Sequence, residues 1–244
     1  MRNQLSFALL QIRNSTDPVR DEEVDCFVRR LAVAPEQVTP IDVLRQPLDA
    51  RIYEQHDAVL VGGSGEYSVL DDAAPIRALL DFLGETATRG FPTFASCFGF
   101  QAMSLALGGE VVHDPDRAEV GTFEIGLTDH AAGDVIFGDL PLRFHAQQGH
   151  KDHVTRLPSV ARHLASSERS AHQAARFGDG LVWATQFHPE LTVEDNRQRV
   201  MRYLELYVSD LDNVLSRMQD SHATHGLLAR FADVLAESKV PRPA

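Results

Sequence analysis

The sequence predicts an α/β protein with an open, mostly parallel central sheet flanked by helices, a smaller antiparallel β part in the second half and C-terminal helices. Up to residue 107, apolar runs of strand length alternate with amphipathic helical patterns, the order typical of a parallel sheet. Residues 57–61 form a continuous apolar run, typical of a strand that helices cover on both faces. From residue 110, short strand-like runs separated by turns follow, which predicts antiparallel hairpins.

The elements of the first half follow from the spacing of apolar residues. Asp17-Pro18 is a helix start, and Pro40 makes the strand around it short or an edge strand, because proline has no N–H to donate. The predicted elements are, in order, a strand at 5–12, a helix at 17–31, a strand at 38–44, a strand at 57–61, a helix at 72–87, a short strand at 90–94 and a helix at 100–107.

In the second half, apolar runs predict strands at 111–112, 123–127, 135–137, 142–146, 161–166, 172–177 and 181–187. Helical patterns follow at 195–208, 211–218 and 227–235, before a polar, proline-rich tail. We therefore expect one domain over 1–208 and a helical extension and tail over 209–244. The apolar faces of the extension either cap the domain or form a homo-oligomer interface, and the sequence leaves this open.

Composition excludes several classes of protein. The 244 residues contain no apolar run near the ~20 residues that span a bilayer, so no membrane association is expected, and residues 5–10 read as a first strand and not as a signal peptide. A formal charge of −12 argues against nucleic acid as a partner. The two cysteines, Cys26 and Cys97, give no disulfide framework, which favours a reducing, cytoplasmic location.

The stretch from Phe94 to Gln101 places Cys97 between a short apolar run and a helical pattern, with Gly99 two residues further on. This is the pattern of a nucleophile elbow, in which a tight turn pushes the side chain out at the carboxyl end of a strand. The N-terminus of the following helix favours a thiolate. Cys26 lies beside an apolar stripe without a neighbouring histidine, and we interpret it as an inert core residue.

Two further motifs end predicted strands. Gly62-Gly63-Ser64-Gly65 follows the strand at 57–61. It lacks the spacing of a dinucleotide or phosphate loop, so it either donates backbone N–H groups to an oxyanion or is a plain turn. In His188-Pro189-Glu190, both ionisable side chains project to the same side of an extended chain, so the pair fits a base with an orienting carboxylate.

Together these pieces resemble the class I glutamine amidotransferase family over about residues 5–208. The chain matches the family's G-x-C-x-G-x-Q and F-H-P-E motifs and its first oxyanion loop, at Cys97, Gly99 and Gln101, at 187–190 and at 62–65. Residues 149–158 are similar to the S-H-G-D-x-V-x-x-L-P stretch of the amidotransferase domain of GMP synthases. Two departures stand out: Ala95 replaces a glycine of the elbow, which crowds it by one methyl group, and Gly149 replaces a serine.

The resemblance implies a reaction and a set of site residues. Cys97 attacks the side-chain amide of glutamine to give a glutamyl thioester, His188 transfers the proton, and Glu190 orients His188. The oxyanion is bound by the N–H groups of Gly63 and Phe98. The residues expected at the substrate are Gly62, Ser64, Gln101, His150 and Asp152.

No cofactor is expected, because the thiol supplies the covalent chemistry. His145, His150 and His153 fit no zinc spacing, so no metal site is expected either.

Three functions stay open at this level. The first is a glutamine amidotransferase, which passes ammonia to a separate synthetase subunit, since no second catalytic module is recognisable in the sequence. The second is a stand-alone hydrolase of γ-glutamyl peptides or amides, which differs only in the leaving group. The third is a catalytically silent regulatory subunit, which the filled cysteine, histidine and glutamate positions disfavour.

Overall fold

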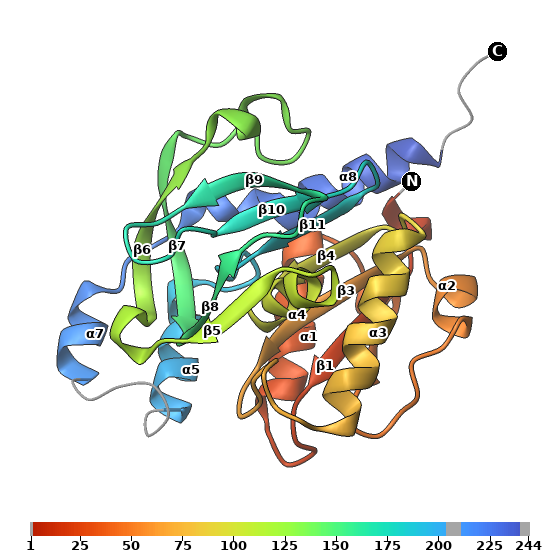
Figure 1. Cartoon of the computed structure of the whole chain (residues 1–244), viewed down its shortest axis with the longest axis horizontal. Coiled ribbons are helices and arrows are strands. Elements are labelled where there is room, and N and C mark those ends of the chain that lie inside the picture. The colour runs from red at the N-terminus through yellow and green to blue at the C-terminus, as the bar shows by residue number, and fades with distance from the viewer. Residues whose placement is uncertain (1, 204–210, 240–244) are drawn as a thin grey trace.

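The computed structural model describes residues 2–203 and 211–239. Its centre is a nine-stranded sheet with the order β2-β1-β3-β4-β11-β10-β9-β6-β7 (Figure 1). The first five strands in this order are parallel, and the others run antiparallel to their neighbours. Their bounds are β1 Phe7–Ile12, β2 Val38–Asp42, β3 Ala58–Ser64, β4 Thr93–Ser96, β6 Glu119–Leu127, β7 Arg143–His150, β9 Ala161–Ser166, β10 Ala174–Phe177 and β11 Val182–Thr185.

A second, two-stranded antiparallel sheet joins β5 (Glu110–His113) to β8 (Asp152–Arg156). The α-helices are α1 Val19–Leu31, α2 Arg51–Gln55, α3 Ala74–Thr88, α4 Phe98–Ala106, α5 Val193–Arg202, α7 Leu211–Arg217 and α8 Leu227–Ser238. The predicted fold class is confirmed, with the addition that the antiparallel strands β10, β9, β6 and β7 continue the same sheet.

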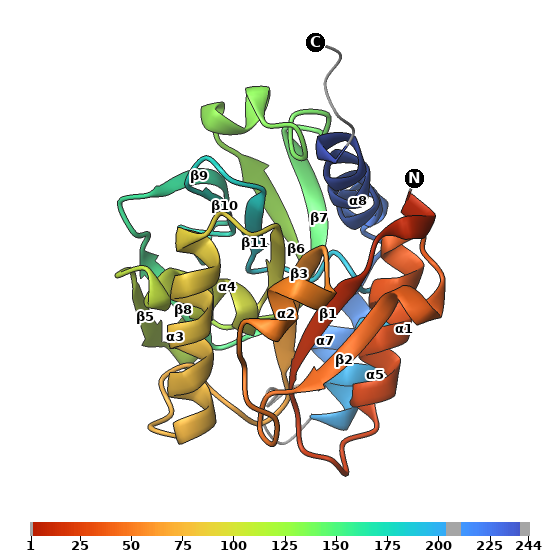
Figure 2. The same cartoon turned by 90° about the vertical axis from the view of Figure 1, so that its right-hand side faces the viewer.

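The parallel strands β1, β3, β4 and β11 are buried on both faces, whereas the edge strand β2 is partly exposed. Successive side chains of a strand point to opposite sides, so each buried strand contributes to two cores. In β1, Leu9 joins a core with residues of α1 and α8, whereas Leu10 joins a core with residues of α2, α3 and α4. Figure 2 shows α1 on one side of these strands and α3 and α4 on the other. This three-layer packing explains why residues 58–61 of β3 are all apolar.

The helix α8 is part of the main core. Its Phe231 packs edge-on against Phe94 of β4 and Trp183 of β11, with ring centroids 5.7 and 6.2 Å apart. Leu227, Leu228, Phe231 and Leu235 are fully or almost fully buried. The apolar face of this helix therefore caps its own domain. The domain boundary at residue 208 stays a prediction.

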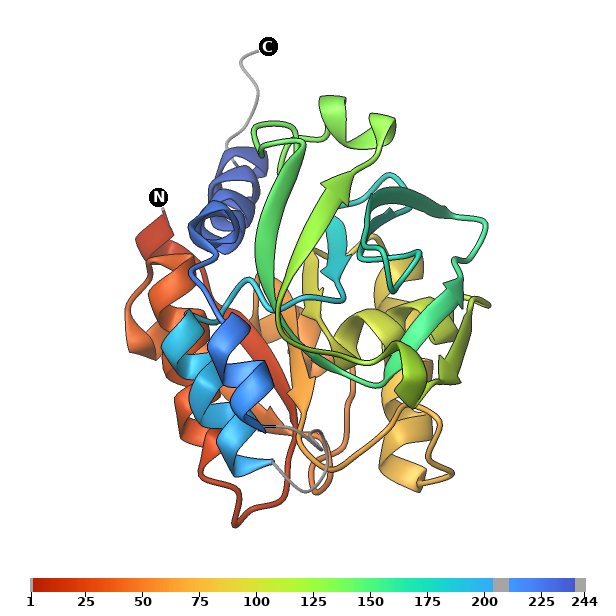
Figure 3. The ribbon, with the colours of Figure 1, turned by 90° about the vertical axis from the view of Figure 1, so that its left-hand side faces the viewer.

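The helices α5 and α7 lie beside the pair of strands β6 and β7 (Figure 3). The helix expected at 195–208 runs from Val193 to Arg202, and positions 204–208 lie outside the described residues, as does the proline-rich tail from residue 240.

Some local predictions were wrong or incomplete. Residues 135–137 form a turn and not a strand, because the Asp134 carboxylate accepts hydrogen bonds from the N–H groups of Ile136 and Phe137. Such a side-chain bond competes with strand pairing. The short helix α2 and the strand β8 were not predicted from the sequence. In the part of the chain that the structure describes, no helix is long and apolar enough to cross a bilayer.

Candidate active site

Three of the predicted site segments meet at one edge of the sheet. Because β3, β4 and β11 are neighbouring parallel strands, their carboxyl ends lie side by side. Gly62, Gly63 and Ser64 end β3, Cys97 follows β4, and His188 lies three residues beyond β11. Open α/β sheets bind their ligands at this edge.

Cys97 has the strained backbone of a nucleophile elbow. Its φ is 52° and its ψ is −105°, a conformation that residues with a side chain rarely adopt and that is typical of functional sites. The Cys97 N–H donates to the Thr185 carbonyl at 2.8 Å, which fixes the turn to β11. The helix α4 begins at the next residue, so its first N–H groups have no acceptor within the helix.

Gly99 is required by the packing of the elbow on the sheet. A Cβ at this position would lie 2.8 Å from Val61 Cβ and 2.9 Å from the Val61 carbonyl oxygen, closer than real contacts allow. The same Cβ would lie 3.0 Å from Ala95 Cβ. The extra methyl group of Ala95 is therefore accommodated because residue 99 has no side chain.

His188 and Glu190 form a buried pair. His188 Nδ1 lies 2.6 Å from Glu190 Oε1, and Glu190 has no exposed surface. The His188 N–H donates to the Gln147 carbonyl at 2.9 Å, which ties this segment to β7. His188 is thus held by one hydrogen bond at its backbone N–H and another at one ring nitrogen.

The electrostatics of the pair favour the charged forms. Burial alone lowers the pKa of His188, but the charge of Glu190 and the neighbouring Cys97, which also hydrogen-bonds to it, raise this pKa to about 9. Burial alone raises the pKa of Glu190, but His188 and then Arg199 lower it below its usual range. An imidazolium is therefore stabilised next to the thiol.

Arg199, on α5, is a neighbour of this pair that sequence reasoning missed. Its Nη1 lies 3.7 Å from Glu190 Oε1, and both side chains are buried. Asn196, Arg199 and Val200 lie on one buried face of α5, as their spacing dictates. Polar residues within the apolar stripe of the helix are the signal that would have singled out Arg199.

The glycine loop is packed as tightly as the elbow. The β3–β4 pairing ends at Val61 and Ala95, so the backbone beyond Val61 is not paired with β4. A Cβ at Gly62 would lie 2.4 Å from Glu23 Oε1, and one at Gly63 would lie 3.0 Å from His188 Cε1. Glycine at both positions thus permits the close approach of the loop to its neighbours.

A buried ionic network, also missed from the sequence, supports this loop. Arg13 donates to Glu23 Oε1 at 2.9 Å and to the Tyr203 hydroxyl at 3.0 Å. The Tyr203 hydroxyl donates to Asp17 at 2.5 Å. Arg13 and Asp17 lie between β1 and α1, Glu23 lies in α1, and Tyr203 directly follows α5. The network therefore joins elements that are far apart in the sequence.

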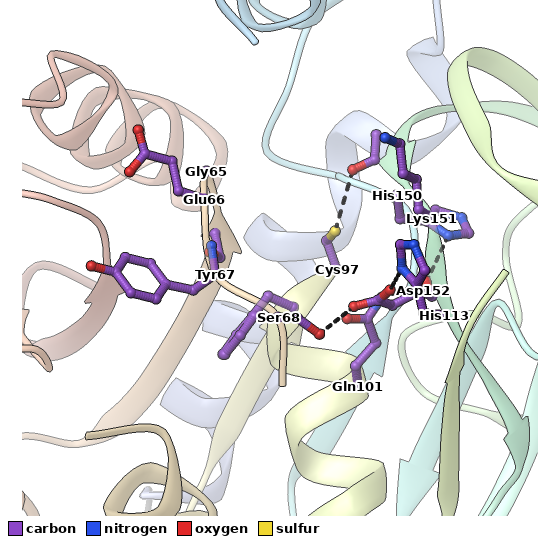
Figure 4. Close-up of a pocket in the computed structure, with 13 residues that line it drawn as sticks. Gly65, Glu66, Tyr67, Ser68, Cys97, Gln101, His113, His150, Lys151 and Asp152 are labelled. Atoms are coloured by element: carbon purple, nitrogen blue, oxygen red, sulfur yellow. Dashed lines mark hydrogen bonds and ion pairs between the residues drawn. The ribbon is translucent and has the colours of Figure 1, made fainter. Parts of the chain in front are cut away.

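Cys97 opens into a pocket of about 210 Å³, called here the substrate pocket (Figure 4). The Cys97 Sγ lies 3.9 Å from the Gly149 carbonyl oxygen. The predicted site residues Ser64, Phe98, Gln101, His150 and Asp152 also line it, whereas Gly62, Gly63 and His188 do not. The lining further includes residues that were not predicted: Gly65, Glu66, Tyr67, Ser68, His113, Gly149 and Lys151.

Hydrogen bonds fix the polar wall of the substrate pocket. The Asp152 carbonyl accepts from Gln101 Nε2 at 2.7 Å and lies 2.9 Å from His150 Nδ1. The Asp152 carboxylate lies 2.6 Å from His113 Nδ1 and accepts from the Ser68 hydroxyl at 2.5 Å. Asp152 thus links the β3–α3 loop to the small sheet across the pocket mouth.

The remaining ring nitrogen of His150 faces the protein interior. His150 Nε2 lies 3.0 Å from Glu119 Oε2, and both side chains are buried. Among the described residues, no three or more histidine, cysteine, aspartate or glutamate side chains are grouped as a metal site would require.

A parallel α/β sheet with a strained cysteine elbow beside a buried histidine–carboxylate pair is the arrangement of a cysteine-dependent hydrolase. Residues 28–205 match the sequence model of the family "Glutamine amidotransferase class-I". The chain belongs to this family. It is accordingly a cysteine-dependent amide hydrolase of the glutaminase type, and the resemblance stated from the sequence is confirmed.

Relatives with similar sequences include GMP synthases. The A subunit of the glutamine-hydrolysing GMP synthase of Sulfolobus acidocaldarius is 33% identical over 138 residues, which cover 57% of this chain and 69% of that protein. The GMP synthase of Mycobacterium tuberculosis is 30% identical over 208 residues, which cover 78% of this chain and 37% of that enzyme. The chain thus aligns with little more than a third of that longer relative.

Solved structures share the fold. A glutamine amidotransferase from Thermotoga maritima matches with a TM-score of 0.74 at 18% identity, covering 96% of this chain and 99% of that one. A protein described as a putative A subunit of GMP synthase, from Thermoplasma acidophilum, matches with a TM-score of 0.66 at 19% identity, covering 97% of each chain.

Proposed function

We propose that this chain hydrolyses the side-chain amide of glutamine with Cys97 as nucleophile. The Cys97 thiolate attacks the amide carbon, and the C–N bond breaks as His188 protonates the departing ammonia. Water then hydrolyses the resulting glutamyl thioester to glutamate. The observation that carries this proposal is the strained elbow at Cys97 together with the 2.6 Å contact between His188 and Glu190.

In this mechanism Glu190 orients His188 and stabilises its imidazolium form. The oxyanion is bound by the backbone N–H groups of Gly63 and Phe98. The position of Phe98 at the first turn of α4 supports this role, because its N–H has no acceptor within the helix.

The remaining proposed contacts are with the bound amino acid. Gln101, His150 and Asp152 shape the wall of the substrate pocket, and their hydrogen bonds to one another support a preformed site. Ser64 lines the same pocket, and Gly62 sets the course of the loop that leads to it.

We further infer that the ammonia is used by a separate synthetase subunit. The similarity to relatives named as the A subunit of GMP synthase supports this partner. The test has two arms. Ammonia release is measured from glutamine and from a panel of γ-glutamyl amides and peptides, with and without a GMP synthase synthetase subunit.

We expect release from glutamine, its loss in Cys97→Ala, and stimulation by the synthetase subunit. Turnover of γ-glutamyl peptides without turnover of glutamine would contradict the proposed substrate. An activity that is unaffected by the synthetase subunit would contradict the proposed partner.

A further inference from the structure

The inner face of α5 reaches several parts of the active site. Asn196, Arg199 and Tyr203 are three and four residues apart, so their side chains lie on one face of the helix and its C-cap. Asn196 donates to the Gln148 carbonyl of β7 at 3.3 Å, and Arg199 adjoins Glu190. Tyr203, the C-cap residue, is the third member of this face and reaches the glycine loop.

Tyr203 packs against the last residue of the glycine loop, which spans residues 62–65. A Cβ at Gly65 would lie 2.7 Å from the Tyr203 hydroxyl oxygen and 2.9 Å from the ring carbon that bears it, closer than real contacts allow. The phenol end of Tyr203 therefore lies directly against the backbone of Gly65. Tyr203 also borders, with Ser64 and His188, one small cavity of about 30 Å³, so its side chain lies beside the catalytic segments.

The preceding glycines of the loop lie against residues that are connected to Tyr203. A Cβ at Gly62 would lie 2.4 Å from Glu23 Oε1, and one at Gly63 would lie 3.7 Å from Arg13 Nη2. Arg13 in turn donates both to Glu23 and to the Tyr203 hydroxyl. One connected set of side chains therefore supports the glycine loop from its first residue to its last.

The Tyr203 hydroxyl is held from two sides. It accepts from Arg13 Nη1 at 3.0 Å and donates to Asp17 Oδ2 at 2.5 Å, so it acts both as acceptor and as donor. Burial and the hydrogen bond to Asp17 raise the pKa of Tyr203, against the opposing charge of Arg13, so the phenol keeps the proton that it donates. Bonds to charged groups are stronger than those between neutral groups, and this pair fixes the ring in one orientation.

We propose that Tyr203 is a positioning residue for the oxyanion site, an inference that rests on the proposed function. Its hydroxyl holds the ring against Gly65, and this contact sets where the loop presents the N–H group of Gly63. The oxyanion forms only as Cys97 adds to the amide carbon, so the contact contributes to the transition state and not to glutamine binding. Tyr203 does not line the substrate pocket, so it acts through the loop.

Tyr203→Phe tests this role, because it removes the hydroxyl and keeps the ring. Two reactions of Cys97 are compared in the full chain. Acylation by glutamine, followed as ammonia release, develops an oxyanion, whereas alkylation by iodoacetamide displaces iodide from a saturated carbon and develops none. Both reactions need the thiolate, so the ratio of their rates separates the oxyanion site from the elbow and from His188.

We expect kcat for glutamine to fall about tenfold in Tyr203→Phe, less than the loss of a whole oxyanion donor would cause. The KM for glutamine and the alkylation rate of Cys97 should stay within about twofold of the wild type. Tyr53→Phe is the matched control, because it also removes a half-buried phenol hydroxyl, whose partner is Thr86 on α3 at 2.8 Å. Both rates should be unchanged in this control.

Asp17→Asn weakens the same clamp from the other side. It keeps an oxygen that can accept from the Val19 N–H at the start of α1. Because the hydroxyl and the carboxylate act through one bond, the double variant with Tyr203→Phe should lower kcat no further than the stronger single variant. Effects on kcat that multiply in the double variant would overturn the clamp.

An unchanged kcat in Tyr203→Phe would overturn the positioning role. An equal fall in kcat and in the alkylation rate would overturn it too, because it would show a general loosening of the site. Both results leave the proposed function intact as long as the wild type releases ammonia from glutamine. Absence of that release from the wild type would overturn the proposed function, and this inference with it.

Discussion

His188 Nδ1 lies 2.6 Å from Glu190 Oε1, in a region where Glu190 is fully buried and Arg199 is the adjoining positive charge. This contact keeps the pKa of His188 raised to about 9 in spite of burial. A charged carboxylate and an imidazolium are thus held together next to Cys97. Several consequences of this arrangement are measurable.

Replacing Glu190 by Gln should shift the alkaline limb of the activity profile to lower pH. In the proposed mechanism the imidazolium is the form that protonates the leaving ammonia, and it is lost as pH rises through the pKa of His188. Without the carboxylate charge this pKa falls by a unit or more, so activity at pH 8 should fall at least about twofold relative to pH 6. The measurement is kcat/KM for glutamine across pH 5–10.

Glu194→Gln, an exposed substitution on α5, is the control for that profile. The same raised pKa also affects stability. The pKa of His188 is about 9 in the folded protein and 6.5 in a model peptide. The protonated His188 therefore stabilises the folded protein fully below pH 6.5, and this contribution is lost as pH rises to 9. An alkaline limb that is identical in Glu190→Gln and wild type would contradict the role given to this pair.

Gly99→Ala should displace the elbow. The added methyl group would meet the backbone of Val61, which cannot rotate away. We expect a loss of about 1–3 kcal/mol in the free energy of unfolding, together with a fall in kcat. Gly226→Ala is the control, because a Cβ there meets no atom within 4 Å. Equal unfolding midpoints in urea for the two variants would show that the close approach is not required.

Glu23→Gln should destabilise the protein strongly even though it changes one oxygen to nitrogen. It removes the buried charge that Arg13 faces at 2.9 Å, and an uncompensated buried arginine costs about 3–5 kcal/mol. Asp17 and Tyr203 still contact Arg13 in this variant, so we expect the loss in free energy of unfolding to lie near the lower end of this range. The neighbouring Glu22→Gln is exposed and should change the free energy of unfolding by less than about 0.5 kcal/mol. Similar urea midpoints for these two variants would be inconsistent with a buried network.

Phe231→Ala tests whether α8 belongs to the main core. Removing a ring that contacts Phe94 and Trp183 should cost about 3–5 kcal/mol. The exposed Glu237→Ala on the same helix provides the baseline. If Phe231→Ala changed oligomeric state without changing the free energy of unfolding, the helix would be serving an interface instead.

The sequence was informative where the chemistry is local. Cys97, Gly99 and Gln101 lie within five residues, and His188 and Glu190 are two apart, so their spacing alone indicates an elbow and an oriented base. The parallel half of the sheet was predictable for a similar reason, because burial on both faces leaves a continuous apolar run such as 58–61.

The supporting contacts were not predictable, because their partners are distant in the sequence. Arg13 and Tyr203 are 190 residues apart, and a single arginine or glutamate in a helix is usually solvated. The turn at 135–137 was missed since the carboxylate of Asp134, and not the apolar pattern, determines the backbone there.

The central claim is that glutamine acylates Cys97. Purified protein is mixed with glutamine, quenched in acid within milliseconds and digested, and the peptide containing Cys97 is examined by mass spectrometry. We predict a glutamyl adduct on Cys97 that forms before ammonia reaches its steady-state rate and that is absent from Cys97→Ala, which also releases no ammonia. Ammonia release by Cys97→Ala at the wild-type rate, with no adduct on the wild-type peptide, would contradict the claim.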